Sequence, residues 1–204
     1  MKILRIAVTG SAGSGKSLVC QRFKEIGLVT LDCDVIARHV VEPGEEAFEK
    51  IVELFGQKVV RREGTLDRAT LRNIIVNDVL LRQKMENILH PQIIKEMVSQ
   101  IENAEAEDKK AVVVEVPLLF ELGMEEQFDV TIAVMAKDMD LIKRISDRDN
   151  VTKKDAQKIL DLQLSQEDKM TRADHVILNE GKRSELFESV DNLFNKIQKE
   201  FLTT

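Results

Sequence analysis

The stretch GSAGSGKS at residues 10–17 constrains this chain more than any other, because it fits the pattern G-x-x-x-x-G-K-[ST] of phosphate-binding loops. An apolar run at residues 3–9 precedes it, and a helical pattern of apolar residues at 15–26 follows it. The motif carries weight only between a strand and a helix, and this sequence supplies both. We therefore interpret residues 10–17 as a loop that holds the phosphates of a nucleotide, and not as a plain glycine-rich turn.

The residues of this loop have separate expected roles. Its glycines allow backbone N–H groups to approach phosphate oxygens, and the start of the following helix adds partial positive charge. We expect Lys16 to reach the β- and γ-phosphates of ATP, and the Ser17 hydroxyl to ligate Mg²⁺. The predicted nucleotide-binding residues of the loop are Ser11, Ala12, Gly13, Ser14, Gly15, Lys16 and Ser17.

Short apolar segments alternate with amphipathic helical patterns along much of the chain. Further strand-like segments lie at 28–32, 111–116, 128–134 and 173–178, with helical patterns at 138–147 and 186–201. This alternation predicts an α/β fold in which helices cover both faces of a parallel sheet. The loop at residues 10–17 then lies at the carboxyl edge of the sheet, where such folds bind ligands.

Charge and composition exclude several classes of protein. A formal net charge of −6 argues against general binding to nucleic acid, so an anionic ligand must meet a local basic patch. Two isolated cysteines, Cys20 and Cys33, make no disulfide framework. No apolar run approaches the ~20 residues of a membrane span, and the N-terminus does not resemble a signal peptide. We expect a cytoplasmic protein that binds neither membrane nor nucleic acid.

Two aspartates flank Cys33 at the end of the strand predicted for residues 28–32. In an extended chain residues i and i+2 point the same way, so Asp32 and Asp34 are both expected to face the phosphate loop. One of them can accept the proton of an attacking hydroxyl late in phosphoryl transfer. The alternative is that Asp32 caps a following helix while Asp34 is solvated.

The sequence favours a kinase over a nucleotide-dependent switch. The chain contains no D-x-x-G, and its one Asn-Lys pair, at 195–196, continues as Ile-Gln and not as the guanine-binding N-K-x-D. Arg144 and Arg148 lie four apart on one predicted helical face and lead into a polar segment. We interpret residues 148–171 as a lid that closes over ATP and excludes water. The alternative for this segment is an exposed, charged helical hairpin.

A long insertion separates the second and third predicted strands. A bare crossover needs only ~10–12 residues, whereas residues 34–110 lack strand character altogether. We expect a helical acceptor-binding insert at 34–110, and a nucleotide-binding core formed by 1–33 and 111–204. Two or three arginines of the insert would suit an acceptor that already carries phosphates. The candidates are Arg38, Arg61, Arg62, Arg68, Arg72 and Arg82.

Several longer motifs carry a resemblance to a known family. The motifs follow one another in the order TGSAGSGKS, LDCDVIARHVVEPG, GTLDRATLR, LHPQI, VPLLFE, KRISDRD and ADHVILNEG, and the match as a whole extends from residue 3 to about residue 181. In this order they resemble dephospho-coenzyme A kinases. The resemblance implies a five-stranded parallel sheet flanked by helices, with an acceptor-binding insert and a lid. It also implies that ATP phosphorylates the ribose 3′-hydroxyl of dephospho-coenzyme A, without an obligate protein partner. The alternative among enzymes is another nucleoside-like kinase.

The resemblance also assigns roles by position. It makes Asp34 the candidate base, assisted in catalysis by Lys16 and Arg144. On the ATP side it adds Arg144, Arg148, Asn179 and Gly181 to the loop. On the acceptor side it implies Thr9, Asp32, Asp34, Arg38, His90, Pro117, Leu118 and Glu121. From the sequence alone, His90 is also explained as the end of a helix before Pro91.

The chain departs from the family pattern at a few positions. Ser11, Ala12 and Leu18 stand where glycine, isoleucine and a hydroxyl residue are usual, which leaves Ser17 as the expected Mg²⁺ ligand. Cys33 stands where alanine is usual. Because a thiol is close to a methyl group in size, and because this side chain is expected to point away from the site, we expect little effect.

Overall fold

The structure is a computed structural model that describes residues 2–202. It divides into two compact units. The first contains residues 2–32 and 103–202, and the second contains residues 33–102. The insert was expected at residues 34–110. The second unit begins at residue 33, slightly before that insert, and it ends earlier, at residue 102.

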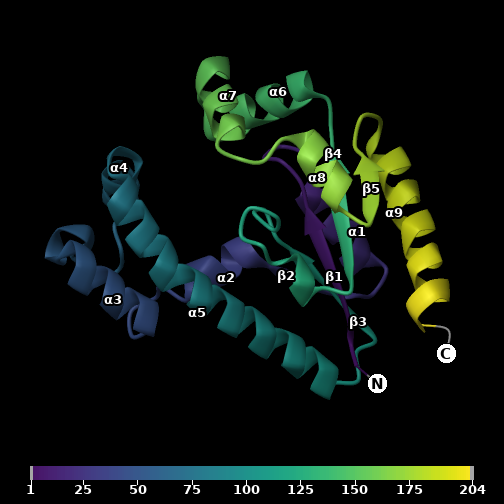
Figure 1. Ribbon diagram of the computed structural model, residues 1–204, viewed down its shortest axis with the longest axis horizontal. Coiled ribbons are helices and arrows are strands. Elements are labelled where there is room, and N and C mark those ends of the chain that lie inside the picture. Colours follow the sequence, from purple (N-terminus) through teal and green to yellow (C-terminus); the bar gives the residue numbers. More distant parts are fainter. Residues whose placement is uncertain (1, 203–204) are drawn as a thin grey trace. The chain divides into compact units, whose positions relative to one another are not determined.

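A five-stranded parallel sheet forms the centre of the first unit (Figure 1). Its strands are β1 (Leu4–Thr9), β2 (Val29–Asp32), β3 (Ala111–Glu115), β4 (Val130–Met135) and β5 (His175–Leu178). Their spatial order is β2-β3-β1-β4-β5, and every neighbouring pair is parallel. The predicted five-stranded parallel α/β sheet is thus confirmed. β1 lies in the middle because its apolar side chains are buried on both faces.

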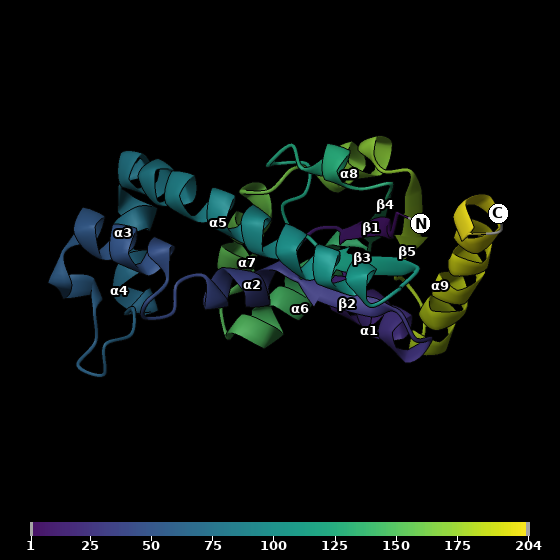
Figure 2. The same cartoon turned by 90° about the horizontal axis from the view of Figure 1, so that it is seen from below.

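Helices cover both faces of this sheet. α1 (Lys16–Glu25) and α9 (Arg183–Ile197) pack on one face, where the rings of Phe23 and Phe194 meet edge to face at 6.0 Å. Figure 2 shows α8 (Gln166–Arg172) on the side opposite α1. α6 (Asp138–Asp149) and α7 (Lys153–Asp161) precede α8 in the chain, and the short elements of this unit are η2 (Glu125–Gln127) and η3 (Gln198–Leu202).

The second unit is built from helices around its own apolar core. Its elements are α2 (Cys33–His39), α3 (Glu46–Phe55), η1 (Gln57–Val59), α4 (Arg68–Asn77) and most of α5 (Val79–Ala106). Ile36, Ile51 and Leu71 are buried in this unit. Asp67 caps α4, because its carboxylate accepts hydrogen bonds from the backbone N–H groups of Ala69 and Thr70.

α5 corrects one sequence interpretation. His90 and Pro91 lie inside this helix, so His90 does not end a helix. A proline in a helix interior removes one backbone hydrogen bond and costs about 3 kcal/mol. The helix nevertheless continues, because apolar residues beyond the proline, Met97 and Ile101, are fully buried or nearly so. Packing here overrides the local preference of the sequence.

Within residues 2–202, each helix is either too short or too polar to cross a lipid bilayer.

Candidate active site

The loop between β1 and α1 has a backbone that only glycine accommodates at several positions. Gly10, Gly13 and Gly15 have φ of +145°, +78° and +99°, which L-residues rarely adopt. A Cβ on Gly10 would lie 2.3 Å from the Val134 carbonyl oxygen, and one on Gly15 would lie 2.2 Å from Asn179 Nδ2. The glycines therefore serve close packing against β4 and the end of β5 as well as a tight turn.

Lys16 is held over this loop. Its Nζ donates hydrogen bonds to the carbonyl oxygens of Gly10 at 3.0 Å and Ser11 at 3.1 Å, and only 8% of the residue is exposed. Gly15 precedes α1 with a left-handed backbone, so the helix begins at the lysine itself. A fixed cation and a helix N-terminus are thus directed to one concave loop, an arrangement that binds phosphate.

Arg144 and Asn179 lie against the same loop. Arg144 Nη1 donates to the Gly13 carbonyl at 3.1 Å, and its Nη2 reaches the Asn179 carbonyl at 3.4 Å. Asn179 is buried, and its Nδ2 donates to the Ser14 carbonyl at 2.7 Å. The structure thus places Arg144 and Asn179, two of the four nucleotide-side residues outside the loop, against the loop itself.

The other two nucleotide-side residues lie further out. Arg148, one helical turn beyond Arg144, pairs with the carboxylate of Asp149 through Nε at 2.7 Å, and most of its side chain is exposed. Gly181 lies in the turn between β5 and α9, just before Lys182, whose N–H donates to Glu185 Oε2 at 3.1 Å.

A carboxylate that the sequence interpretation did not include lies beside Ser17. Ser17 Oγ donates to Glu115 Oε1 at 2.9 Å, and Glu115 is buried at the end of β3. The register of the sheet pairs Glu115 with Asp32 on β2. Ser17, Asp32 and Glu115 therefore supply hydroxyl and carboxylate oxygens, the ligands that Mg²⁺ prefers. The signal in the sequence is one charged residue within the apolar run AVVVEV.

This acidic edge also affects Cys20, which is buried on α1. Burial raises the pKa of the Cys20 thiol well above its usual value, and the negative charges of Glu115 and Asp32 raise it further. The thiol is therefore protonated and unreactive at neutral pH. Cys33 is also buried.

The geometry expected for the two aspartates is wrong. The expectation required an extended chain through residues 32–34, but α2 begins at Cys33, directly after β2 ends at Asp32. Asp34 is therefore an exposed residue in the first turn of a helix, and the i, i+2 argument does not apply to it. A carboxylate in that position interacts favourably with the helix dipole.

Two buried hydroxyls next to the loop lack partners. Thr9 and Ser14 are fully buried, and neither Thr9 Oγ1 nor Ser14 Oγ makes a hydrogen bond with any residue in the range 2–202. A buried polar atom without a partner costs about 1–3 kcal/mol, so a bound group commonly satisfies it. These two hydroxyls, one at the end of β1 and one in the loop, therefore indicate that a polar ligand binds next to them.

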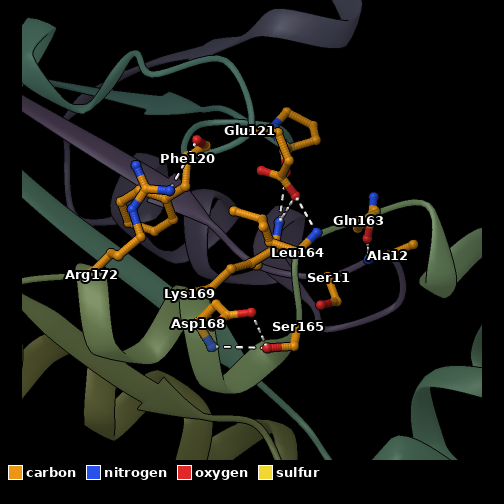
Figure 3. Close-up of polar contacts among 12 residues, drawn as sticks. Ser11, Ala12, Phe120, Glu121, Gln163, Leu164, Ser165, Asp168, Lys169 and Arg172 are labelled. Atoms are coloured by element: carbon orange, nitrogen blue, oxygen red, sulfur yellow. Dashed lines mark hydrogen bonds and ion pairs between the residues drawn. The ribbon is translucent and has the colours of Figure 1, made fainter.

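A short connection between α7 and α8 reaches the phosphate loop. We call residues 162–165 the strap. The Ala12 N–H donates to Gln163 Oε1 at 2.9 Å, as Figure 3 shows. The strap also borders a hollow of about 460 Å³, and Ser11, Asp138 and Leu141 line the same hollow. The polar segment that the sequence marks as a lid thus has a fixed contact with the phosphate loop at its C-terminal end.

A buried ion pair anchors the strap to the turn at residues 117–121. Lys169 Nζ lies 2.6 Å from Glu121 Oε1, which also accepts from the Leu164 N–H at 3.0 Å (Figure 3). The Lys169 side chain is 0% exposed, and that of Glu121 is 15% exposed. Nearby, the Arg172 guanidinium stacks 4.8 Å from the centre of the Phe120 ring. Glu121 Oε1 therefore accepts hydrogen bonds from two groups of the protein itself, Lys169 Nζ and the Leu164 N–H.

The remaining residues that the resemblance assigns to the acceptor lie in both units. Arg38 is exposed on α2, and His90 is half-buried in α5, both in the second unit. Pro117 and Leu118 precede Glu121 in the first unit, where the Pro117 carbonyl accepts from Lys169 Nζ at 3.4 Å. Each unit thus carries part of the predicted acceptor set.

The sheet order together with the loop at residues 10–17 defines the class of this protein as a P-loop kinase. Shikimate kinase from Acinetobacter baumannii shares this fold, with a TM-score of 0.53 at 15% identity over 96% of this chain and 95% of that chain.

The comparison with protein families gives a narrower result. The family model described as dephospho-CoA kinase matches residues 4–185, so this chain belongs to the dephospho-CoA kinase family. A relative named dephospho-CoA kinase from Bacillus cereus is 38% identical over 86% of this chain and 88% of its own length. The solved structure of dephospho-CoA kinase from Campylobacter jejuni is 28% identical, with a TM-score of 0.73 over 96% of this chain and 98% of that chain.

Proposed function

We propose that this protein transfers the γ-phosphoryl group of ATP to the ribose 3′-hydroxyl of dephospho-CoA, which gives CoA and ADP in the last step of CoA synthesis. Membership of the family supports the substrate and the reaction. The observation that carries the proposal is the convergence of Lys16, Arg144 and Asn179 on the glycine loop.

The loop and its cations suit the charge that develops during phosphoryl transfer. The transition state is loose and spreads negative charge over the transferred group, so catalysis depends on positioning and electrostatic stabilisation. Lys16 and Arg144 are both held by backbone carbonyls next to this loop. They are therefore placed in advance and require little reorganisation when ATP binds.

We propose Ser17, Glu115 and Asp32 as the residues that hold Mg²⁺, directly or through water. Their hard oxygen atoms fit this ion, and the first two are already 2.9 Å apart. Bound Mg²⁺ would supply positive charge to the phosphate oxygens of ATP.

We propose Asp34 as the base and Thr9 as a further polar contact in the site. An aspartate is a weak base, but in a loose transition state the proton leaves late, so orienting the hydroxyl matters more than deprotonating it first. Asp34 is exposed and can meet an acceptor. The Thr9 hydroxyl, buried and without a partner among residues 2–202, supports a polar group bound beside it.

The larger parts of the molecule receive proposed roles as well. We propose residues 148–171 as the lid. This segment begins at Arg148 on α6, close to Arg144, and it includes the strap, which contacts the phosphate loop through Gln163. The helical insert binds the acceptor. Neither cysteine forms a disulfide within residues 2–202, which fits a reducing compartment. We therefore propose a cytoplasmic enzyme that acts on small molecules without a nucleic-acid, membrane or obligate protein partner.

A coupled assay of ADP release tests the proposed reaction. The acceptors are dephospho-CoA, adenosine, AMP, uridine, shikimate and pantothenate, each with ATP and Mg²⁺. We expect the highest kcat/KM with dephospho-CoA, and a new phosphomonoester signal in the ³¹P NMR spectrum of the product. Comparable turnover of AMP or uridine, with none of dephospho-CoA, would contradict the proposal. A reaction without added Mg²⁺ tests the metal, and we expect loss of most activity.

A further inference from the structure

We infer that a basic hollow in the second unit binds the diphosphate group of the acceptor. The hollow has a volume of about 280 Å³ and lies among the end of α2, the turn after η1 and the start of α4. This inference rests on the proposed function, because it concerns how that acceptor is held. The inferred ligand is a diphosphate ester, and the residues that bind it are three arginines of the lining, Arg38, Arg61 and Arg68.

Local structure explains why these arginines meet. Gly64, with φ of +86°, makes a tight turn in which the Gly64 N–H donates to the Arg61 carbonyl at 2.9 Å. The Arg61 N–H in turn donates to the Thr65 carbonyl at 2.8 Å, and Asp67 then caps α4. The turn therefore brings Arg61 next to Arg68, the first residue of α4. Hydrogen bonds within the protein thus shape the backbone of this region.

The charges around the hollow are unbalanced. Within residues 2–202, the side chains of Arg38 and Arg68 make no hydrogen bond or ion pair. Arg61 approaches Asp67 and Glu63 only at 3.8 and 3.9 Å, which exceeds hydrogen-bond distance. Glu42 is the one carboxylate in the lining. Three guanidinium groups against one carboxylate, in a chain of net charge −6, mark a site for an anion.

The position of Asp34 relates this hollow to the reacting hydroxyl. Asp34 and Arg38 lie four residues apart on α2, and both are exposed. Residues at this spacing share one face of a helix, with Cβ atoms about 6 Å apart. In dephospho-CoA the diphosphate is attached to the 5′ carbon of the same ribose that carries the 3′-hydroxyl. A ribose bound with its 3′-hydroxyl at Asp34 therefore directs its diphosphate to Arg38.

The chemistry and size of the hollow agree with this ligand. Arginine donates paired hydrogen bonds to phosphate oxygens, and the Thr65 hydroxyl at the lining can donate another. Sites for whole drug-sized ligands have volumes of about 300–1,000 Å³, so this hollow suits one part of a large acceptor. Its apolar lining residues, Val41 and Leu66, are buried and support the polar rim.

Calorimetric titration of dephospho-CoA into protein saturated with a non-hydrolysable ATP analogue tests the inference. Saturation keeps the adenine nucleotide of the acceptor out of the ATP site. We expect Arg61→Gln and Arg68→Gln each to raise the Kd for dephospho-CoA by about 10-fold or more, as for loss of a charged hydrogen bond. Arg68→Lys should recover only part of the affinity, because lysine lacks the paired donors.

Arg62→Gln is the matched control, since Arg62 carries the same charge, is exposed and does not line the hollow. It should change the Kd less than 2-fold, and all variants should bind the ATP analogue as the unaltered protein does. An equal loss in Arg62→Gln and Arg68→Gln would overturn the inference. If the unaltered protein neither binds nor phosphorylates dephospho-CoA, the proposed function itself fails, which is a distinguishable result.

Discussion

Asp34 is the residue on which the proposed chemistry depends most directly. Asp34→Asn keeps the size of the side chain and a hydrogen-bonding oxygen but removes the charge. If Asp34 orients and finally deprotonates the 3′-hydroxyl, kcat should fall by roughly 10²–10⁴, while the KM for the acceptor changes by less than about 10-fold. Steady-state kinetics at fixed Mg²⁺ measure both constants, and circular dichroism confirms that the variant is folded.

Asp32→Asn is the comparison for this prediction. Asp32 ends β2 and pairs in register with Glu115, so its loss should act through the metal and be milder. If Asp34→Asn keeps more than about a third of the original kcat, the assignment of the base is wrong. If Asp32→Asn proves to be the more damaging change, the two aspartates exchange roles.

Cys20 predicts a pH dependence of stability. A free thiol titrates near pH 8.5 in the unfolded chain, but burial raises its pKa in the folded protein. Between these two values the unfolded state binds fewer protons than the folded state, so the free energy of unfolding decreases as pH rises. Urea denaturation at pH 7 and pH 10 measures this effect. The decrease in the free energy of unfolding between the two pH values should be smaller for Cys20→Ala than for the unaltered protein. Equal decreases would show that the thiol does not contribute.

At the scale of elements, a buried ion pair between Lys169 and Glu121 joins α8 to the turn at residues 117–121. Lys169→Met removes the cation and leaves the Glu121 carboxylate without its partner, and such changes cost about 3–5 kcal/mol. We expect a corresponding loss in the free energy of unfolding, measured by urea denaturation. The double variant Glu121→Gln with Lys169→Met should recover part of the loss, because no unpaired charge remains.

Lys143→Met is the control for that measurement. Lys143 also pairs with a carboxylate at 2.6 Å, that of Asp147, but both side chains are largely exposed. Exposed pairs contribute about 0–1 kcal/mol. A loss as small in Lys169→Met as in Lys143→Met would mean that the buried pair does not hold the strap in place.

Patterns within a few residues predicted the fold well. Each of the five strands appears as a short apolar run, and Gly27 follows α1 with the positive φ expected of a helix stop. The loop at residues 10–17 was predictable for the same reason, because its glycines and Lys16 act within one turn. A helix directly after Asp32 was only the alternative interpretation, because α2 follows β2 without a connecting loop that would mark the end of the strand.

Contacts between distant residues were not predictable from one sequence. Ser17 meets Glu115, Ala12 meets Gln163, and Glu121 meets Lys169 only because the sheet order brings their elements together. Nothing near Lys169 in the sequence distinguishes a fully buried lysine from the exposed lysines around it. Such residues become evident only when the whole unit is built.

At the scale of the whole molecule, the two units should respond to different ligands. The phosphate loop and the strap lie in the first unit, and the basic hollow lies in the second. Hydrogen exchange measured by mass spectrometry should show that an ATP analogue protects residues 10–17 and 162–165. Dephospho-CoA should protect residues 38–68. At 100 times the Kd, protection of amides that exchange only from the free state should reach about 100-fold.

The expected result requires the ATP analogue, added alone, to leave residues 38–68 nearly unchanged. Dephospho-CoA is added to protein already saturated with the analogue, so that its own adenine nucleotide stays out of the ATP site, and it should then protect residues 38–68. Residues 183–197 of α9 serve as an internal reference, because this helix carries none of the proposed site residues. Protection by the ATP analogue confined to residues 38–68 would contradict the division of roles between the units.

The central place of β1 has a consequence for synthesis on the ribosome. Leu4 pairs with Ala111 on β3, and Ile6 pairs with Val130 on β4, so β1 waits for partners made about a hundred residues later. At ~5–20 residues per second, the delay is roughly 5–20 s. During that interval residues 33–102, which have their own core, emerge completely and can fold first. An apolar strand meanwhile keeps both edges unpaired, which makes the nascent chain a natural client for chaperones.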